Sequence, residues 1–212
     1  MSFSTTPPPS RMPGMGLRPD RPDRRDRALY AAVPNIDALP DRADLTHLLP
    51  PGHDKPPGID QRWSSACVGY SGASTLYGVM KKDGHRRPFV ASPVFLYREA
   101  RVLGGYLEED AGAEIRLMWK AANKLGLPPQ SNLKPRFLPE DMADPSTAML
   151  PENSIWRRQP PPSVYADAER RQVLTYFRMS TLNDVLQSLA DGWPVQFGFM
   201  MNRSAYGPGG PL

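Results

Sequence analysis

Proline is the feature of this sequence that most restricts how the chain can fold. Twenty-six of the 212 residues are proline, about 12%, where a typical globular protein has ~5%. Proline removes a backbone donor and disfavours helix at the residue before it. Its clusters lie at residues 7–9, 50–51, 56–57, 128–129 and 160–162. The sequence therefore predicts few regular elements, joined by long irregular connections.

Composition excludes several classes of protein. The net charge of +4, from 26 basic and 22 acidic residues, is too small to indicate nucleic-acid binding. The single cysteine, Cys67, excludes an internal disulfide. The sequence has no apolar run of about 18 residues, and its first 16 residues lack the apolar centre of a signal peptide. We therefore expect a cytoplasmic or particle-associated protein with no membrane span, no nucleic-acid partner, no cofactor and no metal site.

The chain divides into a predicted arm, residues 1–27, and one domain, residues 28–212. The arm is rich in proline and arginine, and six arginines accompany three aspartates between Arg11 and Arg27. Such a segment does not bury enough apolar surface to offset the entropy lost on ordering. We expect it to be solvated, unless the body of the domain or an acidic partner holds it.

Apolar residues at helical spacing predict four helices. The first three cover residues 67–82, 93–103 and 113–125, and the fourth begins after Thr181 and ends before Gly192. Ser92 and Thr181 are suitable N-caps. In the fourth helix we expect Leu182, Val185, Leu186 and Leu189 to face the core. Two strands are predicted, at 174–179 and at 195–199, where apolar residues alternate with small or polar ones.

Cys67 and Gln61 make chemical sense as a pair. Cys67 begins the first predicted helix, where unpaired N–H groups and the helix dipole favour a thiolate. The same N–H groups, with the Gln61 amide six residues upstream, could stabilise an oxyanion. This spacing alone is weak evidence, because a single cysteine at a helix start is more often a small buried hydrophobic residue.

Further motifs along most of the chain strengthen this interpretation. Asp60-Gln61 through Cys67 has the spacing of an Asp-Gln-Gly-x-x-Gly-Ser-Cys motif, and residues 189–199 follow a Leu-Ala-x-Gly-x-Pro-Val-x-Phe-Gly-Phe pattern. The remaining matches are residues 18–26, 39–51, 95–103 and 108–116. In order and spacing these segments resemble the bacterial branch of the papain-like (C1) cysteine peptidases.

The resemblance implies an α+β fold. It would have a papain-like helical half of about four helices, a truncated or incomplete antiparallel β part and long proline-rich loops. By position, Cys67 would be the nucleophile and Gln61 the side-chain donor of the oxyanion hole. Gly112 would let a substrate backbone approach the cleft, although an ordinary glycine at a helix start explains it equally well.

The sequence also departs from the family at the nucleophile motif. Arg62 stands where the family has a glycine, and Ser65-Ala66 stand where it has Gly-Ser. We expect side chains here to narrow or remodel the cleft. The family's catalytic histidine lies in a later Gly-His-Ala strand, followed by an Asn-Ser-Trp segment, and neither is present.

The three histidines of the chain do not replace this base. His47 and His53 precede the nucleophile on a proline-rich loop. His85 lies at the far end of the first helix, roughly 27 Å from Cys67 at 1.5 Å per residue. A general base must lie within hydrogen-bond reach. We expect all three to be ordinary surface or loop residues, so the thiol lacks a proton donor for the leaving amine.

Three functions remain open. The chain could be a papain-like cysteine peptidase homologue whose C-terminal half is lost or lies in another chain, so that the single chain is inactive. It could instead be a catalytically dead papain-like subunit with a structural or adaptor role in a larger assembly, such as a phage-like or secreted particle. The third possibility is an unrelated helical binding module. In the first two cases we expect a protein partner that covers the incomplete β half and orders the arm.

Overall fold

The chain has an α+β fold in which helices dominate. A computed structural model describes residues 16–29, 39–53, 60–199, 206–207 and 210–211. Its α-helices are α1 (Cys67–Lys82), α2 (Pro93–Gly104), α3 (Ile115–Leu125), α4 (Pro162–Ala168) and α5 (Leu182–Ala190). In this part of the chain, strands occur only as two short pairs. The predicted fold class is confirmed.

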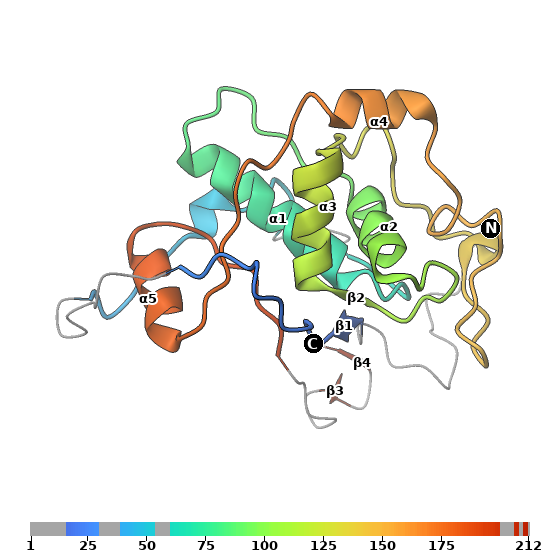
Figure 1. Cartoon of the computed structure of the whole chain (residues 1–212), viewed down its shortest axis with the longest axis horizontal. Coiled ribbons are helices and arrows are strands. Elements are labelled where there is room, and N and C mark those ends of the chain that lie inside the picture. Colours follow the sequence, from blue (N-terminus) through green and yellow to red (C-terminus); the bar gives the residue numbers. More distant parts are fainter. Residues whose placement is uncertain (1–15, 30–38, 54–59, 200–205, 208–209, 212) are drawn as a thin grey trace.

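Helices α1, α2 and α3 pack together as the centre of the molecule (Figure 1). The predicted inward side of α1 is confirmed, because Ala73, Leu76, Tyr77 and Met80 are all buried. Helix α2 is buried from Pro93 to Arg101. Leu103 is exposed, although its apolar spacing predicts that it faces the core. Helix α3 begins two residues later than expected, because Ala113 and Glu114 form a strand.

The predicted caps explain where α2 and α5 begin. The Ser92 hydroxyl accepts a hydrogen bond from the Phe95 N–H at 3.2 Å, and Thr181 forms a reciprocal capping box with Asp184. These bonds satisfy N–H groups that a helix start leaves free. The expected orientation of α5 is wrong at two positions, since Leu182 is 70% exposed and Leu186 is 38% exposed. In the described part of the chain no element covers that side of α5.

The strands differ from the prediction. Neither 174–179 nor 195–199 forms a strand ladder, and the first has only an isolated bridge from Arg178 to Ala28. The observed pairs are β1 (Leu17–Arg18) with β2 (Ala113–Glu114), which is parallel, and β3 (Tyr206–Gly207) with β4 (Gly210–Pro211), which is antiparallel. A sequence with strand character forms a ladder only where another strand pairs with it.

The proline-rich connections contain short helices that periodicity did not predict. These are α4 and the 3-10 helices η2 (Thr46–Leu48) and η3 (Pro139–Asp141). Proline occupies the first turn of both α4 and η3, where its fixed φ suits a helix and its missing N–H costs nothing. Such elements are too short to show a hydrophobic period.

An apolar surface is exposed over α5 and the segments on either side of it. Its most exposed large side chains, between 51% and 88% accessible, are Leu174, Phe177, Leu182, Phe197 and Phe199. Isolated exposed apolar residues are ordinary, but several exposed large apolar side chains in neighbouring segments are less usual. Figure 1 shows α5 set apart from the three central helices.

The described part of the arm, residues 16–27, lies against the domain. The Arg116 side chain on α3 donates to the carboxylates of Asp23 and Asp26, and its backbone N–H donates to Asp20 at 3.0 Å. A hydrogen bond from Arg25 and the charge of Arg116 hold the pKa of Asp23 below its usual range. Charge pairing with the body therefore orders this segment. Residues 1–15 of the predicted arm lie outside the described part.

None of the helices in the described residues has the length and apolar character needed to cross a membrane.

Candidate functional site

Cys67 is the first residue of α1, as the sequence predicts, and its side chain is half-buried. Ala66 stands at the N-cap and makes no side-chain cap. The first N–H groups of the helix are therefore available to an anion. The backbone N–H groups of Gly16, Val68 and Cys67 itself act to lower the pKa of the thiol. The position suits a nucleophilic thiol.

The environment nevertheless keeps the thiol protonated. Burial raises the pKa of Cys67 above its ordinary value, and the negative charge of Asp110 adds to this shift. The three N–H groups oppose the shift but do not overcome it. Desolvation therefore opposes the thiolate that a helix N-terminus favours.

Alkylation of Cys67 should accordingly require alkaline pH. A raised pKa lowers the thiolate fraction at every pH below it, and only the thiolate reacts. We expect the rate of reaction with iodoacetamide to be low at pH 7 and to rise with a midpoint above the ~8.5 of a free thiol. Measurement of the rate between pH 5 and 10 tests this, and a free cysteine-containing peptide serves as the control. Fast labelling below neutral pH would contradict it.

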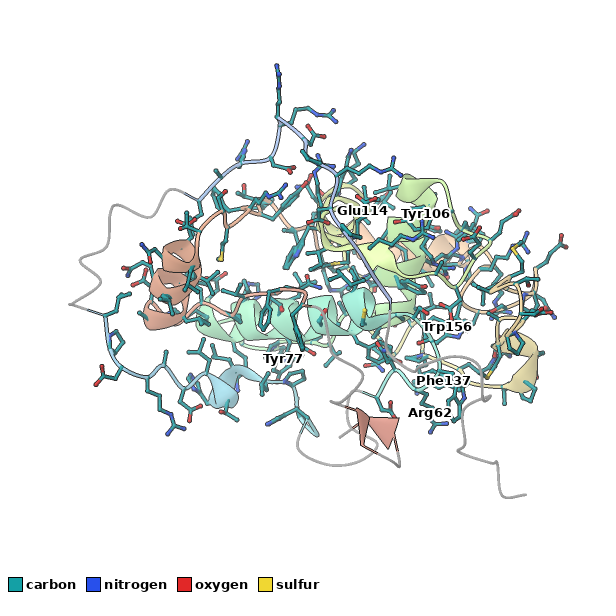
Figure 2. The ribbon with its side chains drawn as sticks, turned by 90° about the horizontal axis from the view of Figure 1, so that it is seen from below. Arg62, Tyr77, Tyr106, Glu114, Phe137 and Trp156 are labelled. Atoms are coloured by element: carbon teal, nitrogen blue, oxygen red, sulfur yellow. The ribbon has the colours of Figure 1, made fainter. Side chains whose placement is uncertain are left out.

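Gln61 and Arg62 lie in the turn that leads to Cys67. The Gln61 carbonyl accepts hydrogen bonds from Ser64, which closes the turn. Among the described residues, no side chain or backbone group bonds the Gln61 amide, so it is available as a donor. Arg62 has φ +48°, and its guanidinium lies 5.0 Å from the centre of the Phe137 ring. Figure 2 shows Arg62 beside Phe137 and Trp156.

Gly112 forms the other wall of the site. It has φ +83°, and a side chain there would overlap the carbonyl of Gly16. The next residue, Ala113, donates its N–H to that carbonyl at 2.8 Å. The expected close backbone approach at Gly112 thus exists, and it is made by the arm. Whether a substrate takes the same place remains a prediction.

The arm residue Gly16 lies beside the turn that carries Cys67. Gly16 lies between Gly112 on one side and the Ser65 carbonyl on the other, and a methyl group on Gly16 would overlap Ser65. The side chain of the next residue, Leu17, packs against Gly198. This arrangement was not predicted, because nothing in the sequence around Gly16 indicates that it lies near Cys67.

Gln196 is a second residue near the nucleophile that sequence reasoning missed. Its amide donates to the Val68 carbonyl at 3.0 Å and to the Ser71 hydroxyl at 2.7 Å, both in the first turns of α1. It belongs to the predicted strand 195–199. Alternation along that strand was the available signal, since it places Gln196 on the side opposite its apolar neighbours.

The histidines lie away from Cys67. His85 follows the far end of α1. His47 belongs to η2, and its carbonyl accepts a bond from Lys81 in the last turn of α1. His53 contacts the Pro50 carbonyl at 3.1 Å. None of them is a base for the thiol in this structure. Within the described residues, no group of His, Cys, Asp and Glu side chains is arranged to hold a metal ion.

Comparison with known proteins supports a papain-like relationship. No family model matches the sequence. An uncharacterized peptidase C1-like protein of Acanthamoeba polyphaga mimivirus is 26% identical over 155 residues, which is 69% of this chain and 45% of that protein. The crystal structure of xylellain, a cysteine protease from Xylella fastidiosa, matches with a TM-score of 0.70 and 26% identity over 87% of this chain and 65% of that one.

The chain is a relative of the papain-like (C1) cysteine peptidases. It spans less than half of the viral C1-like protein and about two-thirds of the xylellain chain. Part of each of these two proteins therefore has no counterpart among these residues. The uncovered apolar face at α5 and the unpaired segment 195–199 lie in the region after the central helices.

Proposed function

We propose that this chain is a papain-like cysteine peptidase homologue in which Cys67 is the nucleophile for thiol-dependent hydrolysis of peptide bonds, and that it is inactive by itself. The observation that carries this proposal is the position of Cys67 at the start of α1, where the first N–H groups of the helix have no intrahelical partner. We propose that these groups and the amide of Gln61 would be the donors for the oxyanion.

The chemistry assigns a role to each part of the site. The thiolate would attack the carbonyl carbon of the scissile bond, and the carbonyl oxygen would take the negative charge beside Gln61 and the helix N–H groups. The amine would leave with a proton, and water would then hydrolyse the thioester. Both steps need a base that accepts and returns the proton. His47, His53 and His85 do not supply it, because none lies at the thiol.

Two further features support inactivity of the chain alone. Gly16 lies beside the turn that carries Cys67, between Ser65 and Gly112. Burial also keeps the pKa of Cys67 raised. Activity would require the arm to move and an imidazole to arrive with the remaining part of the fold. We propose the apolar face formed by Leu174, Phe177, Leu182, Phe197 and Phe199 as the surface on which that polypeptide packs.

The chain alone should not cleave peptides. Purified protein and its Cys67→Ala variant are expected to show the same background with a broad set of fluorogenic peptides, because no general base is present. Turnover by the unmodified chain that Cys67→Ala abolishes would refute inactivity. Addition of a commercial papain-family peptidase to the same assay confirms that the substrates are competent.

A catalytically dead subunit with a structural or adaptor role is the second candidate. The occluded thiol and the exposed apolar face favour it, and a particle-associated location would suit it. Thiol labelling of the assembled protein separates the two candidates. Labelling well below neutral pH would indicate an imidazole paired with Cys67 and support the peptidase. Labelling that rises only in the alkaline range, also after assembly, would support the inactive subunit.

A further inference from the structure

The buried carboxylate of Asp110 connects the Ser65 turn to Gly112, and the arm residue Gly16 lies between these two. Asp110 is only 4% exposed. Its oxygens accept a hydrogen bond from the Ser65 N–H at 3.0 and 3.2 Å and one from the Tyr97 hydroxyl at 2.7 Å. The Tyr97 oxygen in turn accepts from the Gly112 N–H at 3.1 Å. Ser65 belongs to the turn that carries Cys67, and Gly112 is the opposite wall.

Helix α2 holds the residues of this hydrogen-bond network in place. Tyr97 is completely buried in α2, and the guanidinium of Arg101, one turn later, lies 4.1 Å from the centre of its ring. Arg101 also donates to the carbonyls of Leu107 and Glu109 at 3.0 and 2.7 Å. The hydrogen bonds of Arg101 therefore fix the loop that holds Asp110 to helix α2. The carboxylate charge of Asp110 is close to the Arg101 cation.

We propose that Asp110 is a positioning residue for Cys67. Acting through Ser65 and Tyr97, it holds the turn that carries the thiol at a fixed separation from Gly112, and so sets the width of the passage that Gly16 now fills. The chain has one cysteine, so no covalent link joins these walls. A charge-assisted hydrogen bond to a backbone N–H is the strong non-covalent substitute. The inference rests on the proposed nucleophile role of Cys67.

The charge of Asp110 also reaches the thiol, since it contributes to the raised pKa of Cys67. The groups around the network are the Cys67 thiol on α1, Tyr97 and Arg101 on α2, and Asp110 itself. An isosteric change to Asn keeps an oxygen for Ser65 and Tyr97 and removes only the charge. This variant therefore reports whether the carboxylate of Asp110 lies close enough to the turn of Cys67 to act on the thiol, and removal of the Tyr97 hydroxyl reports on the geometric link.

Alkylation of the full chain with iodoacetamide between pH 5 and 10 is the first test. Asp110→Asn is expected to lower the pH midpoint for Cys67, because a nearby negative charge has been removed. Glu108→Gln is the matched control, since Glu108 lies in the same loop with its side chain 63% exposed. Its midpoint should be that of the original chain. An unchanged midpoint in folded Asp110→Asn would overturn the proposal.

Tyr97→Phe tests the geometric link without touching the carboxylate. Loss of the hydroxyl leaves the Gly112 N–H without its acceptor, so its hydrogen exchange should accelerate about tenfold. Tyr77→Phe, at a hydroxyl outside the network, should leave that exchange unchanged. Equal Gly112 exchange in the Tyr97→Phe variant and the original chain would also overturn the proposal. Neither measurement needs catalysis, so a failure of the peptidase proposal leaves both interpretable.

Discussion

Replacement of Gly16 by alanine is expected to free the Cys67 thiol and raise its alkylation rate at pH 8 by about tenfold or more. A methyl group at Gly16 would overlap the backbone carbonyl of Ser65. Backbone cannot move aside as a flexible side chain does, and overpacking of this kind costs about 1–3 kcal/mol. A cost of about 1.4 kcal/mol shifts the ratio of displaced to bound arm tenfold.

The single cysteine makes this measurement unambiguous, because every label lies on Cys67. The rate is followed by mass of the intact protein with iodoacetamide in excess. Gly84→Ala is the control, since Gly84 lies beyond the far end of α1 with open space around it. The Gly84→Ala variant introduces backbone strain, because Gly84 has φ +74°, but it cannot displace the arm. A Gly16→Ala rate within twofold of the original would show that Gly16 does not limit access to the thiol.

Replacement of Arg101 by methionine is expected to lower the free energy of unfolding by about 3–5 kcal/mol. Arg101 is completely buried and donates to the carbonyls of Leu107, Glu109 and Trp156. Methionine fills similar space but leaves these three acceptors without their donor and leaves Asp110 without the nearby cation. Burial lowers the pKa of Arg101, and the charge of Asp110 opposes this shift, which indicates that the two charges interact.

Urea unfolding monitored by circular dichroism gives the size of the effect. A domain has only about 5–15 kcal/mol of net stability, so this variant should unfold at a much lower urea concentration or fail to fold. Arg158→Met is the matched control, because Arg158 is exposed, and it should change the free energy of unfolding by less than about 0.5 kcal/mol. An Arg101→Met variant as stable as this control would mean that the buried guanidinium is not needed to hold the Leu107–Asp110 loop.

Helix prediction succeeded where the signal was local. The apolar spacing of α1 and the caps at Ser92 and Thr181 depend on residues within a few positions of one another, and the structure reproduces them. The prediction failed where a distant partner decides the outcome. Leu182 and Leu186 have the pattern of an inward face, yet they are exposed because no described element covers them. Residues 195–199 have strand character, but no described strand pairs with them.

The candidate site likewise has a part that local sequence predicts and a part that only contacts between distant residues determine. Gln61 and Cys67 were predicted from their spacing before a helix start, and Cys67 indeed begins α1. The contact of Gly16 with the thiol joins residues 51 positions apart, and the bond from Asp110 to Ser65 joins residues 45 apart. No local pattern encodes such contacts.

The sequence by itself determined that a cysteine stands at the start of a helix, that the chain resembles papain-like peptidases and that it has no histidine placed to act as the base. Short-range spacing and composition are sufficient for these conclusions. Only the tertiary structure decided the state of the thiol. The arm residue Gly16 and the carboxylate of Asp110 both lie at the turn that carries Cys67. Burial and the charge of Asp110 raise the pKa of the Cys67 thiol, which the helix position alone would lower. Both effects depend on long-range packing.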